Sequence, residues 1–172
     1  MVERIDKITS LKFGQLMAVY EEGNIENGRM NYPNYSESEQ VLAAEQDFYQ
    51  FLKDFFLNSG CYYYVLSDKG YYVSALRIEP YKDGYLLEAL ETMPKLRGKG
   101  YAQTLVLEML KSLSTENETT VYSHISKTNA ISIVVHEKCA FEKILDYAAY
   151  IDGSVNNRAY TYCYRINKTP AE

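Results

Sequence analysis

The stretch Met93-Pro94-Lys95-Leu96-Arg97-Gly98-Lys99-Gly100-Tyr101-Ala102 decides the interpretation of this chain. A predicted strand runs through it into a glycine-rich turn and then into an amphipathic helix. The backbone N–H groups of residues 98–102 would be the unpaired donors of a helix N-terminus, which bind anions. Gly98 and Gly100 let a ligand approach the backbone, and Lys95, Arg97 and Lys99 add positive charge. The pattern predicts a phosphate or pyrophosphate site. The helix is indicated by apolar residues at helical spacing, namely Ala102, Leu105, Val106, Met109, Leu110 and Leu113.

Two common phosphate motifs do not fit this turn. A dinucleotide fingerprint needs a third glycine where this chain has Gln103, and a P-loop needs a Gly-Lys-Ser/Thr ending. The remaining pattern is Arg-x-x-Gly-x-Ala, formed by Arg97, Gly100 and Ala102. It resembles the acyl-CoA pyrophosphate signature of the GNAT family of acyl-CoA-dependent N-acyltransferases.

A second segment, residues 129–141, is similar to a later helix of the same family. The family pattern has Asn, a small residue, Tyr, and then Glu-Lys-x-Gly-Phe. His136 stands where the family usually has the Tyr, and Ala140 stands where it has the Gly. With these two motifs, the resemblance covers about residues 61–164. The positions of this segment that match are Asn129, Ser132, Glu137, Lys138 and Phe141.

The resemblance implies an α+β fold of three α/β/α layers, with a mixed, mostly antiparallel and twisted sheet. A V-shaped cofactor cleft would splay this sheet between a strand over residues 86–93 and another over residues 120–126. It also implies a single GNAT N-acetyltransferase domain over residues 1–172. Within it, the strand and two helices of residues 1–60 would contribute to the acceptor site, and residues 61–166 would form the acyl-CoA-binding core.

Local patterns predict the remaining elements. Ser10 can cap a first helix that ends at Gly23-Asn24, and an Asn- and Gly-rich loop follows over residues 23–35. Ser36 and Glu39 form a capping box for a long helix. Hairpin turns are expected at residues 67–70 and 82–84. Residues 131–135 are β-branched, but the match of residues 129–141 to the family helix predicts a helix there. The long helix should contribute a core stripe of Val41, Ala44, Phe48, Phe51, Leu52 and Phe55.

The family resemblance also implies roles for site residues. The pantetheine of acetyl-CoA would lie against the main chain of Leu90, Glu91, Thr92 and Met93. The pyrophosphate would lie on Arg97, Gly98, Lys99, Gly100, Tyr101 and Ala102, with Asn129, Ser132 and His136 also near CoA.

Catalytic groups are expected on the same strand and on the later helix. Glu88 is the preferred base and Glu91 the second candidate. Residues three apart on a regular strand point to opposite faces, so only one faces the cleft unless a bulge intervenes. His136 is interpreted either as the general acid that protonates the departing thiolate or as a residue that merely lies near CoA.

Composition limits the partners. Acidic residues outnumber basic ones, 23 to 18, which disfavours nucleic acid. Three scattered cysteines and two histidines suggest neither disulfides nor a metal site, and no apolar run is long enough for a membrane span. We expect a cytoplasmic monomer or homodimer whose residues 167–172 fray.

The function implied by the resemblance is acetyl transfer from acetyl-CoA to a primary amine of an unknown small-molecule or peptide acceptor. The alternative is a non-catalytic acyl-CoA-binding regulatory module.

Overall fold

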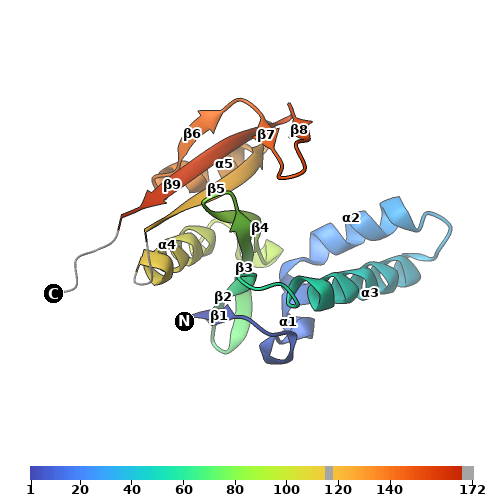
Figure 1. Cartoon of the computed structure of the whole chain (residues 1–172). Coiled ribbons are helices and arrows are strands. Elements are labelled where there is room, and N and C mark those ends of the chain that lie inside the picture. The colour runs from blue at the N-terminus through green and yellow to red at the C-terminus, as the bar shows by residue number, and fades with distance from the viewer. Residues whose placement is uncertain (115–117, 168–172) are drawn as a thin grey trace.

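A computed structural model describes residues 1–114 and 118–167 of the chain (Figure 1). Its main sheet has seven strands in the order β1-β2-β3-β4-β5-β9-β6, and β7 and β8 form a separate hairpin. All neighbouring pairs are antiparallel except β4 and β5, which run parallel. The predicted α+β class with a mixed, mostly antiparallel sheet is confirmed. The strands are β1 (Val2–Ile5), β2 (Tyr62–Asp68), β3 (Tyr71–Tyr81), β4 (Gly84–Thr92), β5 (Thr119–Ser126), β6 (Glu142–Leu145), β7 (Ala148–Ala149), β8 (Val155–Asn156) and β9 (Ala159–Ile166).

Helices cover both faces of the sheet (Figure 1). On one face, α4 packs its buried residues, among them Leu105 and Met109, against β2, β3, β4 and β9. On the other face, α1 and α3 cover a second core that contains Tyr63 and Tyr72. The sheet is therefore the middle of three layers. The helices are α1 (Phe13–Val19), α2 (Glu21–Asn31), α3 (Glu37–Phe55), α4 (Tyr101–Ser114) and α5 (Ala130–Lys138), with short 3₁₀ turns at Ile8–Ser10 and Pro94–Leu96.

The predicted loop over residues 23–35 is wrong for most of its length, because α2 runs through it to Asn31. Gly28 was part of the loop signal, but a Cβ there would lie 2.5 Å from the carbonyl oxygen of Gln40. This glycine therefore permits the close approach of α2 to α3, which outweighs its poor helix propensity. The expected Ser10 cap is also wrong, since Lys12 precedes the first helical residue of α1. That helix ends at Val19, not at Gly23-Asn24.

The capping box at the start of α3 is confirmed, with Ser36 N–H donating to Glu39 at 2.9 Å. The predicted core stripe of this helix is only partly buried. Ala44, Leu52 and Phe55 lie in the interior, whereas Phe51 is 36% exposed. Val41 and Phe48 are half-buried. The exposed part of the stripe lines a cavity described below.

The remaining local predictions agree with the structure. Tight turns at Lys69–Gly70 and Lys82–Asp83 join β2 to β3 and β3 to β4. Residues 130–138 form α5 despite their β-branched side chains. Among residues 1–114 and 118–167, no helix combines the length and apolar character that crossing a membrane would require. The expected fraying of the C-terminal end falls mainly on residues 168–172, which lie outside the described residues.

Candidate functional site

The glycine turn before α4 is open and conformationally special. Gly98 and Gly100 adopt φ values of 78° and 81°, a region that favours glycine. A Cβ at either position would meet nothing within 4 Å, so the backbone is accessible from outside. The Thr104 N–H closes the first helical bond onto the Gly100 carbonyl at 3.0 Å. Within the described residues, the N–H groups of residues 98–103 donate to no protein acceptor, which leaves them available to an anion.

The two parallel strands beside this turn separate along their length. β4 and β5 are paired only at Tyr85, Leu86 and Leu87 of β4. Beyond the last pair, Leu87 with Ser123, β4 continues to Thr92 and β5 to Ser126 without pairing to each other. This is the splay that the family resemblance implies, and it begins at Glu88.

A bulge in β4 sets the direction of both candidate bases. Glu88 is opposite Arg77 and Glu91 is opposite Ala75, so the register shifts between them. Ala89 has φ 50°, an uncommon conformation for a residue with a Cβ. Because Arg77 and Ala75 lie on one face of β3, Glu88 and Glu91 share that face too. The bulge therefore places both carboxylates on the side of α1, α2 and α3.

Arginine side chains engage both carboxylates. Arg77 donates to Glu88 from Nη2 at 2.9 Å and from Nε at 3.3 Å. Its guanidinium also stacks 4.6 Å from the ring centre of Phe51. Arg97 lies 3.4 Å from Glu91 and 2.6 Å from Glu22 of α2. Burial raises the pKa of Glu91, whereas the Arg97 charge opposes that rise.

In residues 90–93, which are expected to hold the pantetheine, some backbone groups are already hydrogen-bonded within the protein. The Glu91 carbonyl accepts from Ser74 Oγ at 2.6 Å, and the Thr92 carbonyl accepts from Arg97 Nε at 3.2 Å. The Met93 N–H donates to the Val73 carbonyl at 2.9 Å. Leu90 packs against the core on the α4 side. Cofactor contacts in this segment would have to use its other backbone groups.

The predicted site residues of α5 hydrogen-bond mainly to other residues of the same helix. Asn129 is the N-cap, and its Oδ1 accepts the Ser132 N–H at 3.0 Å. His136 is 1% exposed and its ring packs edge-on against Phe141. Its Nδ1 donates to the Ser132 carbonyl at 2.8 Å, while Nε2 is buried with no partner among the described residues. Burial lowers the pKa of His136, with the Ser132 bond acting in the opposite direction. This environment favours a neutral ring and does not favour an imidazolium acid.

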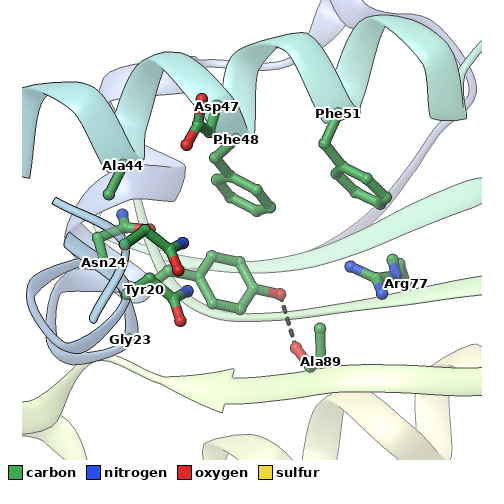
Figure 2. A pocket seen from close by; sticks show the side chains of 11 residues that line it. Tyr20, Gly23, Asn24, Ala44, Asp47, Phe48, Phe51, Arg77 and Ala89 are labelled. Carbon is green, nitrogen blue, oxygen red and sulfur yellow. Dashed lines mark hydrogen bonds between the residues drawn. The ribbon is translucent and has the colours of Figure 1, made fainter. Parts of the chain in front are cut away.

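A cavity of about 340 Å³ lies between α2, α3 and the β4 bulge (Figure 2). Figure 2 shows Phe48 and Phe51 projecting from α3 toward Tyr20 and Arg77. The Tyr20 hydroxyl donates to the Ala89 carbonyl at 2.6 Å, which ties the cavity wall to the bulge. The α2 side supplies amide groups from residues at helical spacing, and α3 supplies one carboxylate. These polar residues are Asn24, Asn27, Asn31 and Asp47.

Sequence reasoning missed several of these residues. Tyr20 and Arg77 carry no motif, although Arg77 is the one cation of β3. Asn24 and Asn27 fall in the predicted loop, and only the helix α2 gives them a common face. His124 lies on β5 at the splay, and no sequence motif contains it.

Comparisons with known proteins were consistent with this architecture. The family model described as FR47-like protein matches residues 70–150. No curated protein matches the sequence. Among solved structures, aminoglycoside 6'-acetyltransferase type Ii is 14% identical with a TM-score of 0.65, over 99% of both chains.

Two further solved structures are similar to this chain at comparable TM-scores. Spermidine N-acetyltransferase from Vibrio cholerae, in a mutant form, is 13% identical with a TM-score of 0.65, over 96% of this chain and 92% of that one. PaiA N-acetyltransferase from Thermoplasma acidophilum, in complex with coenzyme A, is 14% identical with a TM-score of 0.63, over 96% and 99%. At these identities the likeness concerns the fold.

Proposed function

We propose that this chain, which has the fold of the GNAT acetyltransferases, transfers an acetyl group from acetyl-CoA to a primary amine of a small-molecule or peptide acceptor. We further propose that residues 1–172 act as one domain. In this proposal residues 1–60 contribute to the acceptor site and residues 61–166 form the acyl-CoA-binding core.

The cofactor side of the proposal rests on the glycine turn. Gly98 and Gly100 leave the backbone open, and the unpaired N–H groups of residues 98–103 suit a pyrophosphate. Lys99 and the dipole of α4 add positive potential. Arg97 would have to exchange its bonds to Glu22 and Glu91 for a phosphate. Because both ion pairs are half-exposed, that exchange costs little. The pantetheine would then follow β4 along Leu90, Glu91, Thr92 and Met93, in the splay.

The chemistry requires a donor for the thioester carbonyl. A free backbone N–H of β4 beside the splay would stabilise the oxyanion that forms when the amine attacks. One such preorganised donor is worth on the order of 3 kcal/mol of barrier. The splay supports this assignment, because an N–H of a strand without a neighbour on that edge has no ladder partner.

The acceptor side is supported by the cavity next to the bulge. Its aromatic rings and amides suit an acceptor with both apolar and hydrogen-bonding parts. Glu88 and Glu91 place negative charge at the boundary between the cavity and the splay, which would attract an ammonium group. Each carboxylate is already paired with an arginine, so we assign Glu88 and Glu91 primarily to holding the acceptor.

One observation carries the proposal. The splay between β4 and β5 has the open glycine turn at one end and the cavity at its side. The test is release of thiol from acetyl-CoA by the purified protein in the presence of an amine panel, with acetylated products identified by mass spectrometry. Calorimetry with CoA is run in parallel. Amine-dependent thiol release is expected. CoA binding without any thiol release would instead favour the regulatory-module alternative, and absence of both would refute the proposal.

A further inference from the structure

The two strands that form the splay place a histidine and a glutamate at its apex. Leu87 and Ser123 are the last paired residues of β4 and β5, so Glu88 and His124 are the first residues after the strands separate. Paired residues of parallel strands point to the same face, and the next residues point to the opposite face. Leu87 belongs to the core on the α4 side. Glu88 and His124 therefore both face the acceptor side.

Contacts of each side chain agree with this placement. Glu88 is bound by Arg77, whose guanidinium lies over Phe51 of α3. The His124 ring packs edge-on against Tyr81, with ring centres 5.5 Å apart, and Tyr81 lies on the same face of β3 as Arg77. The ring of Tyr150 also packs edge-on against the imidazole, with ring centres 5.1 Å apart. Two aromatic rings thus pack edge-on against the imidazole at the apex.

The hydrogen-bonding state of His124 is unusual. Both ring nitrogens are buried, and neither has a partner among the described residues. Leaving a buried donor and acceptor unpaired costs free energy, so such a group requires an explanation. By contrast, His136 uses Nδ1 to bind the Ser132 carbonyl. Neither nitrogen of His124 is committed to a protein hydrogen bond that a proton transfer would have to break.

The charges around His124 suit a base. Burial lowers the pKa of His124, Glu88 raises it, and Lys82 lowers it. The other titratable groups in contact with the ring are Tyr81 and Tyr150. The ring is therefore neutral near pH 7, and the Glu88 carboxylate would stabilise the imidazolium once a proton arrives. Glu79 is also close to Glu88, and burial and the charge of Glu88 raise the pKa of Glu79.

We propose that His124 is the general base of the reaction and that Glu88 is its electrostatic partner, an assignment that rests on the proposed acetyl transfer. The acceptor ammonium gives one proton to His124. The nitrogen lone pair then forms the C–N bond, the C–S bond breaks with its electron pair going to sulfur, and the second proton of the nitrogen passes to the thiolate. His124 releases its proton to solvent, so that one amide, one thiol and one proton result.

The test compares His124→Phe and His124→Gln with a matched control, Tyr122→Phe. Tyr122 is two residues away on the same face of β5, and its hydroxyl binds Asp83 at 2.7 Å. Both His124 variants should lower kcat/KM for the amine by roughly 10²-fold or more near neutral pH, with CoA affinity unchanged by calorimetry. For an alkyl primary amine the deficit should shrink as the pH rises past about 10.5, where the amine is already mostly the free base. The control should behave as wild type.

A rate within about twofold of wild type in His124→Phe, with the same pH profile, would overturn the assignment. A second readout does not depend on activity. In an NMR titration of the His124 ring, Glu88→Gln should lower the midpoint, because the charge that favours the imidazolium is gone. An unchanged midpoint would also overturn the pairing. An inactive wild-type protein that still shows the shift would refute acetyl transfer while retaining the electrostatic pair.

Discussion

The two faces of the seven-stranded sheet differ in what their side chains do. On the α4 face, residues such as Leu76, Leu87 and Leu105 are less than 2% exposed and make a closed apolar core. On the face under α1, α2 and α3, the core is interrupted near β4 by Arg77, Glu88 and a cavity. A polar group on this face is tolerated because each charge has a partner. The comparison indicates that the first face is a continuous apolar core, whereas the second combines an apolar core with the polar groups of the candidate site.

The largest effect should come from truncation on the closed face. Leu105→Ala removes a fully buried side chain and should lower the free energy of unfolding by about 3 kcal/mol. Phe51→Ala, on the cavity side, should cost about 1 kcal/mol, since that ring is 36% exposed and its contacts are with Arg77 and two neighbouring rings of α3. Urea denaturation measures both. Equal losses would remove the distinction between the two faces.

The glycine turn offers the next largest effect. Gly100→Val should weaken CoA binding by at least about tenfold, because the side chain would fill the space where a phosphate meets the backbone. Gly153→Val is the matched control, since Gly153 also has a positive φ, of 84°, and open space around it. Both variants should lose similar stability. Calorimetry with CoA should then separate them, and equal affinities would place the phosphate elsewhere.

The buried histidine of the closed face should make stability depend on pH. Because burial lowers the pKa of His136, the unfolded chain binds the proton more readily than the folded one. The contribution is complete above about pH 6.5 and is lost as the pH falls below it, with a slope of up to about 1.4 kcal/mol per pH unit. His124 contributes in the same direction. His136→Phe should therefore remove only part of the dependence of the unfolding free energy on pH. Urea denaturation at several pH values across this range measures it.

The same variant tests the catalytic reading of His136. If this residue were the general acid, His136→Tyr would recover much of the kcat that His136→Phe loses. We expect instead that the two variants have similar kcat, because the ring is 1% exposed and directed into the helix.

The smallest expected effect is a gain in stability at the end of α5. Ala140 has φ 62°, and the Phe141 N–H donates to the His136 carbonyl at 3.0 Å, which is the pattern of a helix C-cap that favours glycine. Ala140→Gly should therefore raise the free energy of unfolding by about 1 kcal/mol. Ala43→Gly, within α3, should lower it by about the same amount. A loss in both variants would contradict the strain at Ala140.

Regular periodicity made much of the fold predictable. The spacing of apolar residues in α4, the capping box of α3 and the two hairpin turns are local signals, and each corresponds to an element of the structure. The loop prediction for residues 23–35 was wrong because Gly28 has a role that depends on a neighbouring helix. Its missing side chain matters only against the Gln40 carbonyl, a contact that no window of local sequence contains.

The sequence by itself determined the glycine turn, the helix that follows it and the alternation of strands, since these depend on backbone preferences and on periodic burial over a few residues. Tertiary structure decided which side chains meet. The bulge at Ala89, held by the distant Tyr20 hydroxyl, brings Glu88 and Glu91 to one face. The point where β4 and β5 part brings His124 beside Glu88 and leaves His136 in the core. Such contacts join residues far apart in the chain, and their geometry follows from packing of the whole sheet.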